Sequence, residues 1–314
     1  MNVTYFKYAL EVEKTASITQ AANNLYMGQP NLTKAIKKLE ASVGFAIFKR
    51  TQHGVFPTKK GTEFLNYARN IISLIDQMEE LYSQNNTNMV NFNICVPRAS
   101  YIAYTFSRFI NELVKQKELN VDFKETGSTE IINNVASGEY NLGIIRYSNR
   151  HEKYFQSIMA DKNLQRKQLW EFEYLVLMSE DNPLAKSKEI HMEDLELFTE
   201  ITHGDVSVPS ENHSFISRSE SAGKTQSRIY IYERGSQFNL LKGVPTTYMW
   251  VSPLPDNILK EHKLVQRKCV NIDDMCMCKD ILIHRTDYKL SKTEKVFFDY
   301  LNQTITELSS KTFN

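Results

Sequence analysis

The sequence predicts a two-part chain: a small all-α domain with one β-hairpin and a long helix, followed by a larger α/β domain. Three observations support this fold class. Apolar residues recur at helical spacings of three and four through most of the first 80 positions. From residue 90 onward, short strands alternate with amphipathic helices, which is the pattern of right-handed βαβ crossovers in a mostly parallel sheet. Basic side chains concentrate in the first 60 residues, so the two parts also differ in charge.

This difference in charge is large. Residues 1–60 contain nine Lys or Arg and three Glu, a net charge of +6, whereas the remaining residues carry 29 basic and 34 acidic side chains. A basic segment joined to an acidic one indicates that the first part alone binds a polyanion. A small basic domain can also present a solvated surface, so charge alone leaves both interpretations open.

Length and composition limit the class of protein. A chain of 314 residues is long enough for two or three compact units. It has no run approaching the roughly 20 apolar residues that span a bilayer, and its first 13 positions lack the layout of a secretory signal. We therefore expect a cytoplasmic protein without a membrane partner. The cysteines are too few for a disulfide framework, which agrees with a reducing compartment; they are Cys95, Cys269, Cys276 and Cys278.

Two helices are predicted at the start of the chain. Phe6, Leu10 and Val12 can share one side of the first helix. Ser17 and Gln20 then fit a capping box, in which the Ser17 hydroxyl caps a helix reaching about residue 25 and Gln20 reaches back to close it.

A tight turn at 26–28 leads into a third helix, with Pro30 near its first position, where the missing N–H costs nothing. Leu32, Ile36 and Leu39 occupy one face at spacings of four and three, so we expect them to be buried. The outer face carries short polar and basic side chains, namely Asn31, Thr33, Lys34, Lys37 and Lys38.

A small hairpin is expected after Gly44, with strands at 46–48 and 55–56 around a turn at 50–54. Thr58 can cap a long helix that reaches about residue 83. Apolar residues of this helix alternate spacings of four and three, which is an a/d seam more typical of helix pairing than of burial in one globule. The polar run 83–88 is interpreted as a hinge. The seam predicts a homodimer through Ala68, Ile71, Ile75, Met78 and Tyr82, with Phe64 at its start.

The larger part shows two α/β series. Strands are predicted at 90–96, 121–125 and 142–145, with helices at 100–116 and 129–137 between them. A second series starts near Leu169, with its first strand at 174–178. Its middle, 206–227, is polar and rich in serine. A strand at 281–284 and an amphipathic helix at 292–308 complete the pattern.

Two short helices joined by a tight turn and followed by a hairpin form a winged helix-turn-helix. In this motif the second of the two helices enters the DNA major groove, and the hairpin reaches the backbone or the minor groove. Gln29 can make paired hydrogen bonds to a base edge, and the lysines can meet phosphates. The alternative is a solvated surface helix, which the coincidence of turn, cap, hairpin and charge disfavours. The predicted DNA contacts are Gln29, Pro30, Asn31, Thr33, Lys34, Lys37, Arg50 and His53.

These segments resemble the LysR-type transcriptional regulators in order and spacing. The stretches SITQAA at 17–22, QPNLTK at 29–34 and IKKLE at 36–40 are similar to the helix-turn-helix of that family. FKR at 48–50, GV at 54–55 and TKKG at 58–61 are similar to its wing and to the start of its linker helix. A looser resemblance continues through the larger part, in GS at 127–128, NPLA at 182–185 and FDYL at 298–301.

The resemblance implies a fold, a function and a set of partners. It implies a DNA-binding domain at 1–58, a linker helix and hinge at 59–88, and two Rossmann-like subdomains like those of periplasmic solute-binding proteins, at 89–163 plus 268–314 and at 164–267. The protein would be a sequence-specific transcription regulator controlled by a small-molecule effector held between the subdomains. It would bind double-stranded promoter DNA, form homodimers that pair into homotetramers, and have RNA polymerase as a further candidate partner.

The residues that match the effector cleft of the family lie near the carboxyl ends of strands, where loops and helix N-termini present N–H groups. Ser100 and Ser128 can equally be helix caps. Arg146 can equally form an ion pair, and His203 can be a satisfied loop histidine. If Arg146 and His203 do face the cleft, the effector is anionic, and Arg98 is a further cationic candidate. The predicted effector contacts are Ser100, Tyr101, Ser128, Arg146, Thr202 and His203.

The sequence also departs from the pattern of the family. Gly28 stands where a serine is usual, which weakens one phosphate contact and the helix cap. His53 lies where an arginine commonly enters the minor groove, and a near-neutral imidazole binds there less strongly. Lys59 and Lys60 can compensate. Asn141 replaces a frequent aspartate.

Other classes of protein are disfavoured. An enzyme is not expected, because the sequence has no phosphate-binding glycine loop, no metal-binding histidine spacing and no nucleophile elbow. No cofactor or metal is expected. Cys276 and Cys278 could form a thiol switch, but two cysteines one residue apart on a strand point to opposite faces, so ordinary apolar positions are favoured. A DNA-coating architectural protein would not need some 220 residues of α/β sensor.

Overall fold

The computed structural model describes residues 2–82, 89–115, 118–187, 189–204, 227–270 and 277–311. Its contacts divide the chain into two compact units, Met1–Thr87 with Ser137–Glu139 and the remainder. We call the first 82 residues the head and residues 89–311 the body. Among the described residues, no helix is long and apolar enough to cross a membrane.

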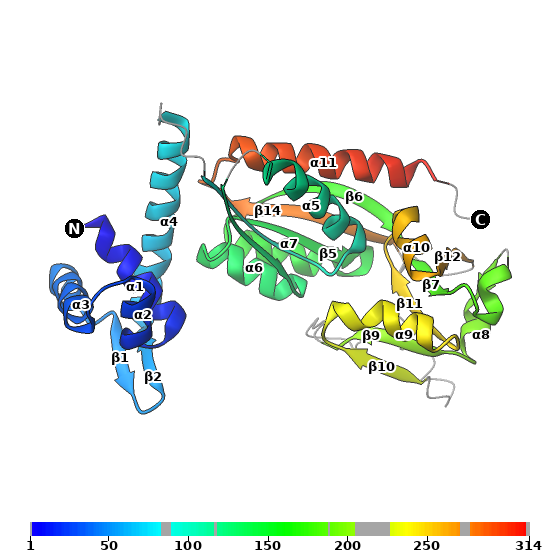
Figure 1. Cartoon of the computed structure of the whole chain (residues 1–314), viewed down its shortest axis with the longest axis horizontal. Helices are drawn as coiled ribbons and strands as arrows, with labels where there is room; N and C mark the ends of the chain where they lie inside the picture. The colour runs from blue at the N-terminus through cyan, green and yellow to red at the C-terminus, as the bar shows by residue number, and fades with distance from the viewer. Residues whose placement is uncertain are drawn as a thin grey trace. The chain divides into compact units, whose positions relative to one another are not determined.

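The head is a bundle of four helices with a two-stranded hairpin (Figure 1). Its core consists of the apolar faces of the helices, in which Leu32, Ile36 and Leu39 are buried as their spacing predicts. The Ser17 side chain accepts a hydrogen bond from the Gln20 backbone N–H, as predicted. The reciprocal half of the capping box is wrong, because the Ser17 backbone N–H donates to the Thr15 hydroxyl oxygen and the Gln20 side chain donates to Asn24. The elements are α1 (Val3–Thr15), α2 (Ile18–Asn24), α3 (Gln29–Val43), β1 (Phe48–Thr51), β2 (Gly54–Pro57) and α4 (Lys59–Tyr82).

Helix α4 begins where the sequence predicts. The Thr58 hydroxyl accepts a hydrogen bond from the Gly61 N–H at 2.9 Å, which is the expected cap. Gly61 packs directly on the hairpin, because a Cβ at this position would lie 1.9 Å from the carbonyl oxygen of Ile47. Only a glycine lets α4 approach the hairpin so closely.

The first subdomain of the body is a five-stranded sheet with the strand order β4-β3-β5-β14-β6. Strands β3, β4 and β5 are parallel, and β14 runs antiparallel to both of its neighbours, β5 and β6. Helices α5 and α11 pack on one face of the sheet and α6 and α7 on the other (Figure 1). The elements are β3 (Met89–Val96), α5 (Ser100–Leu113), β4 (Glu118–Glu125), α6 (Ser128–Ser137), β5 (Leu142–Ser148), η1 (Asn149–His151), α7 (Glu152–Asp161), β6 (Leu164–Glu173), β14 (Met277–Arg285) and α11 (Lys292–Ser309).

The second subdomain is a five-stranded sheet with the order β10-β9-β11-β7-β12, and a short parallel pair, β13 and β8, beside it. Strands β9, β10 and β11 are parallel to one another. The elements are β7 (Leu175–Ser179), η2 (Pro183–Lys186), β8 (Ile190–His191), α8 (Met192–Leu195), β9 (Thr199–His203), β10 (Arg228–Ile231), η4 (Arg234–Ser236), α9 (Gln237–Gly243), β11 (Thr247–Val251), α10 (Asp256–His262), β12 (Leu264–Arg267) and β13 (Cys269–Val270).

The predicted fold class is therefore confirmed, but one boundary needs correction. The second subdomain was predicted to begin at residue 164, yet Leu164–Glu173 pairs with β14 and completes the first sheet. Alternation of apolar residues identifies a strand but does not say which sheet it joins. Several features that the sequence singled out lie outside the described residues, namely the predicted hinge at 83–88, the side chain of Tyr82, the run 206–226 and Cys276.

Candidate functional site

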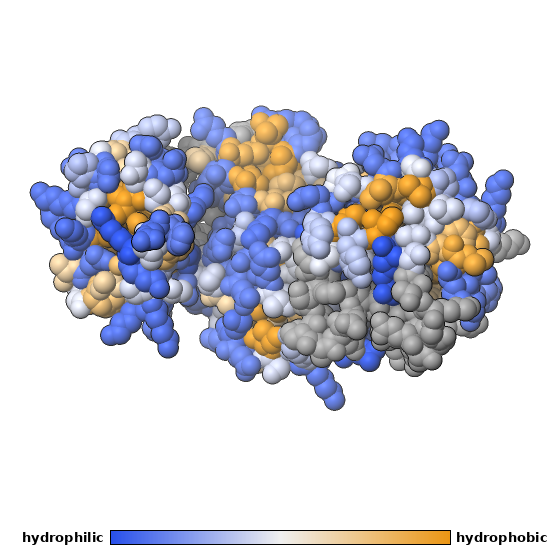
Figure 2. All heavy atoms as spheres, turned by 90° about the horizontal axis from the view of Figure 1, so that it is seen from below, coloured by the Kyte–Doolittle hydropathy of each residue, from blue (hydrophilic) through white to orange (hydrophobic). Residues whose placement is uncertain are grey.

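The outer face of α3 carries the side chains that the sequence singled out for DNA. Gln29, Pro30, Asn31, Lys34 and Lys37 are exposed, and Thr33 is half-buried. Within the described parts of the chain, no carboxylate forms a salt bridge with the lysines of this face. Hydrophilic residues also make up much of the side of the head seen in Figure 2. Among the described residues, this face therefore presents hydrogen-bonding groups and positive charge that no carboxylate neutralises.

The N-terminus of α3 has no side-chain cap. Gly28 is its N-cap and makes no side-chain hydrogen bond to the helix, which agrees with the missing serine noted in the sequence. The preceding Tyr26 has a left-handed backbone, with φ of 51°, and its side chain is 97% exposed. The exposure of Tyr26 was not predicted. It lies in a turn, where no helical or strand periodicity tells an exposed aromatic residue from a buried one.

The hairpin is held in a fixed position beside α3. A carboxylate oxygen of Glu40, near the end of α3, accepts hydrogen bonds from the backbone N–H groups of Ile47 and Phe48 at 2.8 and 3.1 Å. Arg50 and His53 are exposed on the hairpin, as expected of residues that reach a partner. Glu40 was not predicted to have a role, since its bond partners lie outside its own helix.

The exposed apolar stripe of α4 differs from the predicted seam. Ala68 is only 1% exposed and packs in the head core, so its predicted role in dimerisation is wrong. Phe64 also faces that core. Ile75 is half-buried. The exposed apolar side chains at spacings of four, three and four are Tyr67, Ile71, Leu74 and Met78, with exposed fractions of 63, 39, 49 and 53%. Of these, the sequence predicted Ile71 and Met78.

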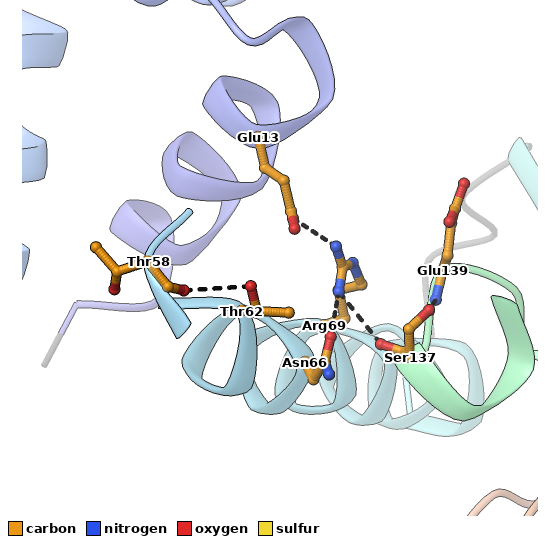
Figure 3. Close-up of polar contacts among 7 residues, drawn as sticks. All are labelled: Glu13, Thr58, Thr62, Asn66, Arg69, Ser137 and Glu139. Atoms are coloured by element: carbon orange, nitrogen blue, oxygen red, sulfur yellow. Dashed lines mark hydrogen bonds and ion pairs between the residues drawn. The ribbon is translucent and has the colours of Figure 1, made fainter. Parts of the chain in front are cut away.

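A half-buried ion pair joins α4 to α1. Figure 3 shows the Arg69 guanidinium reaching both Glu13, near the end of α1, and Asn66 one turn earlier in α4. Burial raises the pKa of Glu13, and the charge and hydrogen bond of Arg69 oppose that rise. The pair therefore helps to fix the orientation of α4, and of its exposed apolar stripe, relative to α1.

In the body, Arg146 and Tyr101 belong to a buried network rather than to an open site. The Arg146 guanidinium donates to both carboxylate oxygens of Asp280, with Nε–Oδ1 and Nη2–Oδ2 distances of 2.7 and 2.6 Å. The Tyr101 hydroxyl donates to the same carboxylate at 2.5 Å. Asp280 and Tyr101 are fully buried, and Arg146 lies over the Phe172 ring. Both polar groups therefore already serve Asp280, and contact of Arg146 and Tyr101 with an effector stays a prediction.

The other predicted effector residues lie near the carboxyl ends of parallel strands. The Ser128 hydroxyl donates to the Arg146 carbonyl oxygen at 2.7 Å and accepts from its N–H at 3.0 Å, so it ties α6 to β5. Ser100, the first residue of α5, is buried. Thr202 and His203 end β9 in the second subdomain and are half-buried.

An ion pair joins the two subdomains at this edge. Arg234, the first residue of η4, donates to a carboxylate oxygen of Glu125, the last residue of β4, at 2.5 Å. The two side chains are 18 and 21% exposed. Neither residue was singled out in the sequence, since 109 positions separate them.

A hollow of about 400 Å³ lies between α7 and β6, bordered by Lys153, Gln156, Leu164 and Arg166 among others. None of the predicted effector residues borders it. Within the part of the chain described, no group of three His, Cys, Asp or Glu side chains could hold a metal ion.

Comparison with known proteins places these features in a family. Residues 4–62 match the model of the bacterial regulatory helix-turn-helix protein, lysR family, and residues 94–304 match the LysR substrate binding domain. A relative, the uncharacterized HTH-type transcriptional regulator YcgK of Bacillus subtilis, is 29% identical over 147 residues, which are 46% of this chain and 45% of YcgK. The chain thus spans about half the length of that relative.

Solved structures of similar fold cover nearly the whole chain. A full-length variant of OxyR from Pseudomonas aeruginosa superposes with a TM-score of 0.62 at 16% identity, over 98% of this chain and 96% of OxyR. CbnR in complex with its target DNA superposes with a TM-score of 0.57 at 16% identity, over 97% of this chain and all of CbnR. At such identities the likeness concerns the fold alone.

Proposed function

This chain belongs to the LysR family of bacterial regulators, and on that premise we propose that it regulates transcription by binding promoter DNA under the control of a small-molecule effector. The observation that carries the proposal is the outer face of α3, where Gln29, Lys34 and Lys37 are exposed and form no salt bridge within the described chain. Helices that read DNA need donors and cations that the protein leaves unused. Such a regulator works in the cytoplasm, and RNA polymerase is a candidate partner.

Selection of bound sequences from a random DNA pool tests this proposal. A regulator enriches one motif, expected as two half-sites related by two-fold symmetry and centred about one helical turn or a multiple apart. An architectural protein that coats DNA would instead retain the pool without enrichment, and that result would contradict the proposal. An enzyme is not the favoured alternative, since the matching family models are those of regulators.

We further propose that two chains pair through the exposed stripe of α4, Tyr67, Ile71, Leu74 and Met78, and that dimers pair into tetramers. A two-fold dimer matches a two-fold DNA site. Leu74→Asp should place a charge in the paired stripe and yield monomers in light scattering. Leu197→Asp is the matched control, because Leu197 is 88% exposed in the body. Unchanged oligomers of Leu74→Asp would count against this stripe.

For the effector we propose a site between the subdomains, near the carboxyl ends of the parallel strands. Ser100 and Ser128 begin helices α5 and α6, whose N-termini attract negative charge. Thr202 and His203 lie at the corresponding end of β9. Arg146 and Tyr101 are not part of this proposal, because Asp280 occupies their polar groups.

A further inference from the structure

The ion pair between Glu125 and Arg234 spans the two subdomains at the edge where an effector is proposed to bind. Glu125 ends β4, and η4, which Arg234 begins, follows β10. The Arg234 Nη1 donates a charge-assisted hydrogen bond to the Glu125 Oε1. Both side chains are about four-fifths buried. The contact therefore holds the subdomains together at one point.

A second arginine stands near the same carboxylate. Arg98 follows β3 by two residues, and the last residue of β3, Val96, pairs with Glu125 in the sheet. Burial raises the pKa of Glu125, whereas Arg234, by charge and hydrogen bond, and Arg98, by charge, lower it. The Glu125 carboxylate is thus hydrogen-bonded to Arg234 and lies in the field of a second arginine, Arg98.

We propose that Glu125 acts as an internal substitute for the carboxylate of an anionic effector, and that such an effector displaces it from Arg234. This inference rests on the proposed function, because it names the ligand class and the cation of the proposed effector site. Planar guanidinium groups match both carboxylates and phosphates. A small organic acid is the expected ligand because the group that Arg234 already binds here is a carboxylate.

The structure favours Arg234 over Arg146 as the cation that an effector would bind. Arg146 is bound in bidentate fashion by a carboxylate that is fully buried in the sheet, so a ligand would have to break a core ion pair to reach it. The bond of Arg234 to Glu125 lies nearer the surface and joins two subdomains, so it can open without unfolding a sheet. Opening it also frees the subdomains to adopt a second arrangement, and a ligand that prefers that arrangement shifts the population toward it.

Titration of the full-length protein with simple acids tests the inference. The probes are propionate and succinate, with propionamide as the uncharged match to propionate. If the internal pair is formed about 90% of the time, Glu125→Gln should bind the carboxylates about tenfold more tightly than the natural chain, because a competitor for Arg234 is lost. Combining Glu125→Gln with Arg234→Gln should abolish the gain, and propionamide should show none.

The matched control is Glu130→Gln, which removes the same charge five residues away. Glu130 pairs with Lys124 at 2.8 Å within the first subdomain and is 51% exposed. Glu125→Ala provides a second variant in case the glutamine still bonds to Arg234. Carboxylate binding that is no tighter in both Glu125 variants than in Glu130→Gln, including no binding at all, would overturn the inference.

Selection of DNA by the same proteins distinguishes a failure of this inference from a failure of the proposed function. If the natural chain enriches a DNA motif but the Glu125 variants gain no affinity for carboxylates, only the internal substitute is refuted. If the natural chain enriches no motif, the proposed function fails, and a carboxylate gain in the Glu125 variants would still support the ligand site.

Discussion

The outer face of α3 and the carboxyl edge of the first body sheet both carry cations, but they use them differently. On α3, Lys34 and Lys37 project from a helix whose other face is buried, and neither forms a salt bridge within the described chain. At the sheet edge, Arg146 pairs with Asp280 and Arg234 pairs with Glu125. The difference teaches that the described lysines of α3 are left available to a charged partner, whereas these arginines of the body are neutralised by the protein's own carboxylates.

The largest expected effect lies in the body. Asp280→Ala would leave the Arg146 guanidinium buried without its counter-charge, and such a change costs about 3–5 kcal/mol of unfolding free energy. Denaturant unfolding of the variant should show this loss. Glu112→Ala is the control, because Glu112 pairs with Lys115 at the surface and such pairs contribute about 1 kcal/mol or less. Equal stability of the two variants would show that the buried network does not hold the sheet together.

A smaller effect is expected in the head. Gly61→Ala would bring a Cβ to 1.9 Å from the Ile47 carbonyl oxygen, so α4 or the hairpin must move. Overpacking of this kind costs about 1–3 kcal/mol. Thermal unfolding should reveal it, and DNA affinity should fall because the hairpin shifts relative to α3. Gly235→Ala is the control, since a Cβ there meets no atom within 4 Å. Identical behaviour of both variants would mean that α4 does not press on the hairpin.

The smallest effect concerns salt. Lys34→Ala should weaken binding to all DNA sequences alike and reduce the slope of log affinity against log salt concentration by about 1, because one phosphate contact is lost. Lys115→Ala removes the same charge from the body and should leave the slope unchanged. If both variants kept the natural slope, Lys34 would not face a phosphate.

The head could be predicted well from the sequence because its signals are local. A cap at Ser17, the apolar positions Leu32, Ile36 and Leu39, and the turn before α3 are each decided by residues a few positions apart. The error at Ala68 has a physical reason: a run of apolar residues at spacings of four and three covers both the face against the core and the exposed stripe.

The body could be predicted only at the level of its alternating strands and helices. The partners that decide its polar residues lie far away in sequence: 134 positions separate Arg146 from Asp280, and 179 separate Tyr101 from it. No spacing rule connects such positions, so the partner of Arg146 was not predicted. Glu125 and Arg234 were not predicted for the same reason, because 109 positions separate them in the sequence.

The central claim is that α3 reads base sequence, and affinity measured on a set of single-base variants of the selected site tests it most directly. Gln29→Ala should lose discrimination at one base position, by about 1–3 kcal/mol, while the ranking at the other positions is kept. Lys34→Ala should lower all affinities and keep every ranking. If Gln29→Ala bound all site variants with the natural affinities and the natural ranking, α3 would not be the element that reads the sequence.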